Sequence, residues 1–104
     1  RSYLGAAQEQ WLEQALGRSA GRWNVVGQQT LFGPRDARPG PGQRFWNDGW
    51  DGYPAARTRL LDALQRQRVS NPVFFGGDVH ENWVGHVKAD YSRADSAAIG
   101  VEFC

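Results

Sequence analysis

The sequence contains no methionine and only one cysteine, Cys104, in 104 residues. A single cysteine excludes a disulfide within the chain, so the cysteine content leaves the redox compartment open. No apolar run is long enough to cross a membrane, and no secretory signal peptide is visible. Twelve basic and eleven acidic side chains give a net charge of +1, so the chain lacks the basic field typical of nucleic-acid binding.

The composition is that of a small globular domain. Hydrophobic residues make up 40% of the chain and charged residues 22%, which is unlike a disordered segment. The length suffices for one domain and leaves little room for a second. The first residue is not methionine and the last segment, "SAAIGVEFC", stops within a predicted strand. We therefore expect the chain to be a piece of a longer one, incomplete at both ends.

The first half predicts a helix, a strand and a long loop. Residues 22–32 are rich in β-branched and aromatic side chains and predict a strand buried on both faces. Residues 33–52 are rich in glycine and proline and predict a loop. Residues 3–16 predict an amphipathic helix that stops at Gly17, because apolar residues recur at helical spacing: Leu4, Trp11, Leu12, Ala15 and Leu16.

The second half predicts a helix and three strands. Pro54 suits the first position of a helix over residues 54–68, with a leucine stripe toward the core and arginines on a solvated face. The stripe consists of Leu60, Leu61 and Leu64. Apolar or alternating patterns then predict strands at residues 71–77, 83–91 and 97–103. This order of elements indicates an α/β layer architecture with a mixed sheet.

Two polar clusters lie toward the carboxyl ends of predicted strands, Gln28–Gln29 and Asp78–His80. In open α/β sheets ligands bind beyond the carboxyl ends of strands, so we expect both clusters to meet on one rim. If the backbone stays extended, Asp78 and His80 project to the same side. A carboxylate and an imidazole could then bind metal or act as an acid/base pair. The alternative is an Asp–His hydrogen bond that only stabilises a turn.

Other polar residues have both a structural and a functional interpretation. Gln28 and Gln29 could hydrogen-bond loop backbone or contact a ligand. Asp51 is expected to cap the helix that begins at Pro54, and a part in catalysis is the alternative. His86 on a strand is expected to be structural or exposed, and Cys104 to be a buried thiol.

The long loop adds arginines and aromatic residues. Its arginines could neutralise a phosphate group or remain solvated: Arg35, Arg38 and Arg44. Its aromatic residues are expected to be partly buried in a clamp over the rim: Trp46, Trp50 and Tyr53.

Five stretches together resemble the PhoD-type alkaline phosphatase/phosphodiesterase family, a branch of the calcineurin-like metallophosphoesterases. They are residues 3–16, 23–32, 47–61, 71–83 and 101–104, in this order. The resemblance covers nearly the whole chain. It implies that residues 1–104 are the C-terminal part of a PhoD-like metallophosphatase domain, a layered α/β sandwich with a mixed sheet. Its earlier part, with aspartate ligands of a dinuclear or trinuclear metal centre, would lie outside this chain.

The resemblance also implies roles for the two clusters. "GGDVH" looks like the superfamily's G-H-x-H segment with Asp78 in place of the first histidine, so Asp78 and His80 are expected to be metal ligands and catalytic residues. The family is associated with iron and calcium, and another divalent metal is an alternative. Gln28–Gln29 stand where the superfamily has a histidine ligand at a strand end. Here the sequence departs from the pattern, and a substrate contact is the expected role.

The function implied by the resemblance is hydrolysis of phosphate esters by water that a metal activates for in-line attack. The substrate would be a phosphate ester, the location periplasmic or extracellular, and the isolated chain inactive. A competing hypothesis is a non-catalytic α/β module in which the Asp78–His80 pair is structural. No nucleic-acid surface and no membrane segment is evident from the sequence.

Overall fold

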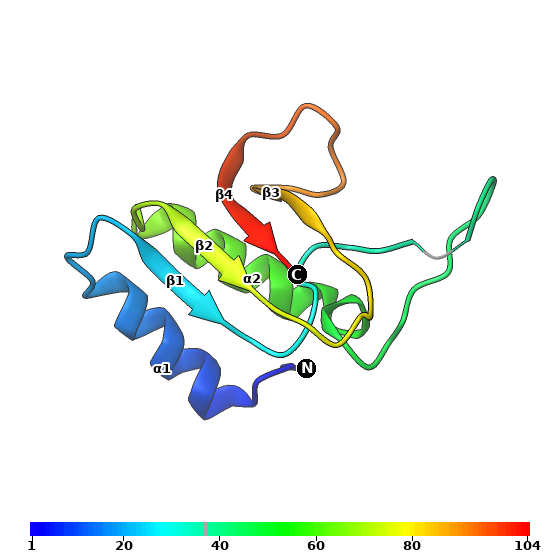
Figure 1. Ribbon diagram of the computed structural model, residues 1–104. Coiled ribbons are helices and arrows are strands. Elements are labelled where there is room, and N and C mark those ends of the chain that lie inside the picture. The colour runs from blue at the N-terminus through cyan, green and yellow to red at the C-terminus, as the bar shows by residue number, and fades with distance from the viewer. Residues whose placement is uncertain (37) are drawn as a thin grey trace.

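The computed structural model describes residues 1–36 and 38–104; Ala37, within the predicted loop, lies outside the described residues. Two α-helices, one short 3-10 helix and four strands follow one another along the chain (Figure 1). They are α1 (Ala6–Gly17), β1 (Asn24–Gly27), η1 (Trp50–Gly52), α2 (Pro54–Arg66), β2 (Pro72–Phe75), β3 (Val84–Lys88) and β4 (Ala98–Phe103). No helix among the described residues is both long and apolar enough to span a membrane.

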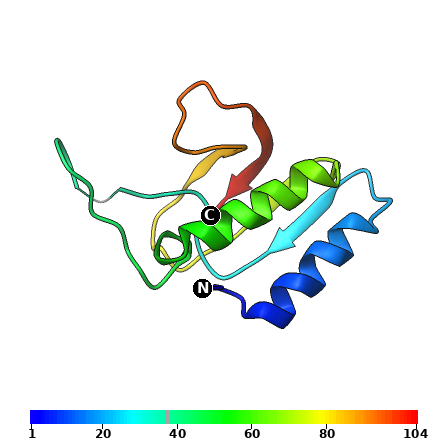
Figure 2. The same ribbon diagram turned by 180° about the vertical axis from the view of Figure 1, so that it is seen from behind.

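The four strands form one mixed sheet in the order β1-β2-β4-β3. β1 and β2 are parallel, β2 and β4 are parallel, and β3 is antiparallel to β4. Helix α2 connects β1 to β2 and lies across one face of the sheet, behind it in Figure 1 and in front of it in Figure 2. Helix α1 contacts α2 along the same side. The predicted α/β architecture with a mixed sheet is confirmed.

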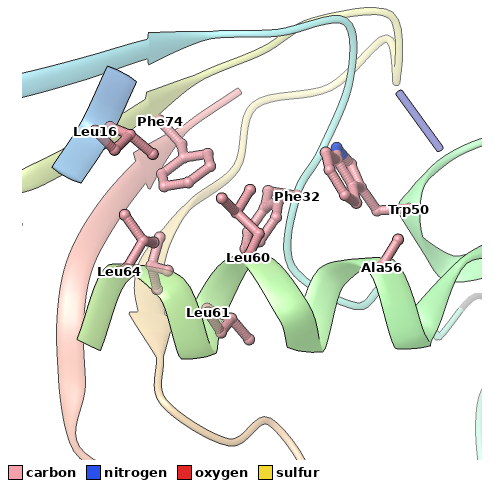
Figure 3. Close-up of a cluster of buried hydrophobic side chains, with 9 residues drawn as sticks. Leu16, Phe32, Trp50, Ala56, Leu60, Leu61, Leu64 and Phe74 are labelled. Carbon is pink, nitrogen blue, oxygen red and sulfur yellow. The ribbon is translucent and has the colours of Figure 1, made fainter. Parts of the chain in front are cut away.

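The core lies between the sheet and α2 (Figure 3). The predicted leucine stripe of α2 is buried, and Phe74 from β2 packs against it together with Leu16 from α1. Phe32 stacks on Phe74 with ring centroids 4.5 Å apart and meets Trp50 edge-on at 4.9 Å. This aromatic series joins the sheet, the segment after β1 and η1 into one core.

Several predicted features differ from the structure. The strand predicted at residues 22–32 is limited to Asn24–Gly27, because the following residues turn away from β2 and enter the core as a loop. Trp11 lies off the buried side of α1, with 60% of its surface exposed, whereas Leu12 and Leu16 face the core. Pro54 begins α2 at its first turn, as predicted.

Burial on both faces, predicted for β1 and β2, is found over Pro72–Phe74 of β2 but not at Phe75 or along β1. Alternate residues of each strand point to the same face of the sheet. On the face toward the helices, Phe74, Glu102 and Val87 are buried. On the opposite face, among the described residues, the apolar side chains remain largely uncovered, Val25 being 64% exposed. This open face carries Val25, Phe75, Val84, Val101 and Phe103, whereas Val73 in the same row is only 9% exposed. Phe75 and Phe103 stack on each other there at 5.6 Å.

Asp51 does not cap α2, so that prediction is wrong. The residue before the helix is Tyr53, and no side chain caps the first turn. One Asp51 oxygen instead accepts a hydrogen bond from the Arg57 guanidinium at 2.7 Å, and the other accepts one from the Arg35 backbone N–H at 3.0 Å. The side chains of Arg57 and Asp51 are only 11% and 10% exposed. Arg57 therefore lies in the interior and not on the solvated face that the sequence predicted.

We expect residues 1–104, expressed alone, to self-associate through the open face, because a contiguous exposed apolar surface favours association. Lysine at Val25 and Val84, both on edge strands, places charge on this surface and should restore a monomer. The control variant carries lysine at Gln10 and Gln14, which are exposed on α1. Light scattering of the three proteins checks this, and an unmodified chain that is monomeric at high concentration would contradict it.

The Asp51–Arg57 pair predicts a stability effect that distinguishes pairing from capping. Asparagine caps helices as well as aspartate, so Asp51→Asn would be neutral if Asp51 were a cap. Loss of a charged hydrogen-bond partner should instead lower the free energy of unfolding by roughly 1.5–3 kcal/mol. Denaturant unfolding measures this, with Asp62→Asn on the exposed side of α2 as the control. Equal stability of the two variants would refute a stabilising pair.

Candidate functional site

The segments that follow β1 and β2 lie side by side at the carboxyl ends of these strands. The Gly77 N–H donates to the Gln29 carbonyl oxygen at 3.3 Å, and the Gly76 N–H donates to the Phe103 carbonyl oxygen at 3.1 Å. A Cβ on residue 76 would lie 2.0 Å from the Thr30 carbonyl oxygen, so only glycine permits this approach. The two polar clusters therefore meet on one rim, as predicted.

Asp78 and His80 do not continue an extended strand. Their φ angles are 68° and 62°, in the left-handed region that non-glycine residues rarely adopt. The prediction that an extended backbone aligns the two side chains is therefore wrong, because the chain turns sharply around Val79. Such backbone conformations concentrate at functional sites, where the surrounding structure maintains them.

The side chains of Asp78 and His80 are both exposed. In the part of the chain that the structure describes, neither side chain takes part in an ion pair, and the turn around them is closed by a backbone bond from the Val79 N–H to the Gly77 carbonyl oxygen. No Asp78–His80 hydrogen bond forms within residues 76–83. Both groups are thus accessible to a ligand.

The described residues contain no group of three or more histidine, cysteine, aspartate or glutamate side chains placed to hold a metal ion. Asp78 supplies carboxylate oxygens, which suit hard cations, and His80 supplies an imidazole nitrogen, which suits iron or zinc. The chemistry of these two donors would fit a metal ion, but among the described residues no third such side chain is placed to complete a site. His86 lies apart from them on β3, exposed, as predicted.

Gln28 and Gln29 differ sharply in their surroundings. The Gln28 amide oxygen accepts hydrogen bonds from the Thr30 N–H at 3.2 Å and from the Trp50 indole at 3.0 Å, and its amide nitrogen donates to the Thr30 carbonyl oxygen. Gln28 thus bonds loop backbone, which was the structural alternative for this residue. The Gln29 side chain is exposed on the rim. Of the two, Gln29 is the one available to a substrate.

Only one of the three loop arginines reaches the rim. The Arg35 guanidinium pairs with Glu81 and lies over the Trp83 ring, 5.7 Å from its centroid. Arg38 and Arg44 are exposed in the outer loop, where their backbone N–H groups both donate to one Asp36 oxygen at 2.9 Å. The hydrogen bonds from Arg44 and Arg38 lower the pKa of Asp36.

Two further groups border the rim. Burial, followed by the charges of Asp48 and Asp78, raises the pKa of the Tyr3 phenol, so Tyr3 remains a neutral hydrogen-bonding group. Burial also raises the pKa of the Cys104 thiol, which lies 3.5 Å from the Gly77 carbonyl oxygen. The thiol is half-buried, so it is less enclosed than the buried thiol that the sequence predicted.

The predicted aromatic clamp forms in part. Trp50 is fully enclosed in the core and Tyr53 is half-buried, whereas Trp46 is largely exposed. Two buried charged residues were missed in the sequence, Arg57 and Glu102. The alternation of Glu102 with Val101 and Phe103 in β4 would place Glu102 on a solvent face, so its burial against the helices ran against the sequence pattern.

Comparisons with known proteins agree with this fold. The family model for PhoD-like phosphatases matches residues 1–104. Alkaline phosphatase D of Bacillus subtilis (strain 168) is 37% identical over 103 residues, which make up 99% of this chain and 18% of that protein. The solved structure of PhoD matches with a TM-score of 0.88 and 36% identity, over 95% of this chain and 19% of that one.

The chain thus spans about one fifth of the length of these relatives. The match nevertheless extends over both helices, the whole sheet and both loops of the rim, since it includes every described element. By sequence and by fold, the chain belongs to the PhoD-like phosphatase family.

Proposed function

We propose that a longer protein containing this chain hydrolyses phosphate esters and that Asp78 and His80 form part of its metal centre. Family membership supports the reaction class. The observation that carries the assignment of the site is the rim itself: a carboxylate and an imidazole stand exposed, in left-handed backbone, just after β2. Ligand sites of open α/β sheets lie at such carboxyl ends.

The metals proposed are iron and calcium, with another divalent metal as the alternative. Asp78 would contribute carboxylate oxygen, the donor that calcium prefers, and His80 would contribute imidazole nitrogen to iron. A bound metal supplies positive charge that stabilises the phosphoryl group and makes water a stronger nucleophile. The remaining ligands would come from polypeptide outside residues 1–104.

Residues of this chain would then bind the phosphate ester and orient it. Gln29 projects from the neighbouring loop and could donate a hydrogen bond from its amide to a phosphoryl oxygen. Gln28 would fix the loop below it through Thr30 and Trp50. A protein nucleophile is not required, and the only thiol, Cys104, is protonated and in contact with Gly77.

Changing Asp78 or His80 to alanine should lower bound metal and phosphatase turnover together. For loss of a metal ligand we expect at least about a 10-fold decrease in each, since even residues that only support ligands have effects of this size. Elemental analysis and hydrolysis of a chromogenic phosphate ester by the full-length protein measure both. Asp62→Ala and His86→Ala are matched controls, because both residues are exposed and lie on α2 and β3, outside the two loops of the rim.

Two results would contradict the proposal. Full metal content and turnover in Asp78→Ala would remove this residue from the centre. A full-length protein that contains no metal and stays inactive when iron and calcium are added would favour the competing hypothesis of a non-catalytic module.

The two glutamines should separate into a binding and a structural role. Gln29→Ala should raise KM for the phosphate ester without changing the melting temperature. Gln28→Ala leaves the buried Trp50 indole without a partner and should cost about 1–3 kcal/mol of stability. Steady-state kinetics and thermal unfolding of the full-length variants measure both. The reverse pattern would show that the roles are exchanged.

A further inference from the structure

The loop after β1 is buried although it has no regular secondary structure. Thr30, Leu31, Phe32 and Gly33 are all inaccessible. Buried backbone N–H and C=O groups need hydrogen-bond partners, and a loop cannot obtain them from a helix or a sheet ladder. Side chains from other elements must therefore supply them.

Glu102 of β4 supplies two of these partners. One carboxylate oxygen accepts from the Phe32 N–H at 2.6 Å and the other from the Gly33 N–H at 2.9 Å. Glu102 is only 4% exposed. Burial raises the pKa of its carboxyl, while these two N–H groups and the charge of Arg57 act in the opposite direction.

Arg57 and Asp51 hold the same loop from the other side. The Arg57 guanidinium donates to the Phe32 carbonyl oxygen at 3.1 Å and to Asp51, and Asp51 accepts from the Arg35 N–H. Three charged side chains from β4, α2 and η1 thus bond the backbone of residues 32, 33 and 35. We call Glu102, Arg57 and Asp51 the loop clamp.

The clamped loop supports the loop that carries Asp78 and His80. Three contacts join the two loops, namely the Gly77–Gln29 backbone bond, the Gly76 approach to Thr30 and the Arg35–Glu81 ion pair. A displacement of Phe32 and Gly33 would therefore shift the surface on which residues 76–81 rest. At reacting centres a displacement of about 1 Å can reduce the rate about 100-fold.

We propose that Glu102 is a positioning residue, which acts through Phe32 and Gly33 to hold the Asp78–His80 loop in its place. The effect on catalysis rests on the function proposed above. The effect on the loops does not, because it concerns only contacts within this chain.

The test is Glu102→Gln in the full-length protein. Glutamine retains the size of glutamate, but its NH2 group would face a backbone N–H, so one of the two bonds is lost. We expect faster hydrogen exchange in residues 28–35 and 76–81, unchanged exchange in α2, and a kcat about 10- to 100-fold lower with little change in KM. Asp95→Asn, exposed between β3 and β4, is the matched control.

A second variant disturbs the clamp while Glu102 stays intact. A Cβ on residue 33 would lie 3.1 Å from Glu102 Oε1 and 3.3 Å from the Tyr91 hydroxyl, so in Gly33→Ala the loop and these side chains must separate by a few tenths of an ångström. The same exchange pattern with a smaller fall in kcat is expected. If Glu102→Gln does not fold, this variant tests the positioning role of Glu102 in its place.

The outcomes separate the two proposals. Unchanged exchange in both loops, or exchange that rises equally in α2, would overturn the positioning role. Local exchange as expected with normal kcat would also overturn it. If the unmodified protein has no phosphatase activity, the proposed function fails, and the exchange pattern alone still tests whether Glu102 holds the loops.

Discussion

The buried charge of Arg57 is the constraint on which the arrangement of the elements depends. A guanidinium cannot lose its proton in a protein, so an interior arginine must be surrounded by acceptors. Here the acceptors come from separate parts of the chain: Asp51 of η1 and the Phe32 carbonyl oxygen, with Glu102 of β4 close enough to interact electrostatically. The Tyr91 ring lies beside the guanidinium at 5.6 Å, and burial raises the pKa of its phenol to about 12. Helix, loop and sheet must be in place together for this charge to be accommodated.

Apolar packing and polar bonding converge on the same short loop. Phe32 places its ring between Phe74 and Trp50, while its backbone N–H and C=O bond to Glu102 and Arg57. Burial of the ring supplies the driving force to bring the loop inside, and the charged side chains satisfy its backbone once it is there. The position of Phe32 therefore bears on the rim, because the loop that contains it contacts the Asp78–His80 loop.

Sequence patterns predicted the elements and the location of the rim, because these follow from local rules. Pro54 marks a helix start, leucines at helical spacing mark a core face, and strand ends mark the ligand edge. The partner of Asp51 could not be predicted in this way, since an aspartate before a helix usually caps it and Arg57 belongs to a helix full of arginines. The left-handed backbone of Asp78 and His80 was also missed, because the sequence pattern suggested only that the strand continues in extended form.

The contacts between the two rim loops respond differently to ionic strength. The Gly77–Gln29 bond joins neutral backbone groups and is little affected by salt. The Arg35–Glu81 pair has side chains that are 34% and 48% exposed, and at physiological salt charges are screened over about 8 Å. Concentrated salt therefore weakens the Arg35–Glu81 contact while the Gly77–Gln29 contact is retained. In dilute buffer Glu81 stays paired with Arg35. An anion that binds the Arg35 guanidinium must then displace Glu81 from it.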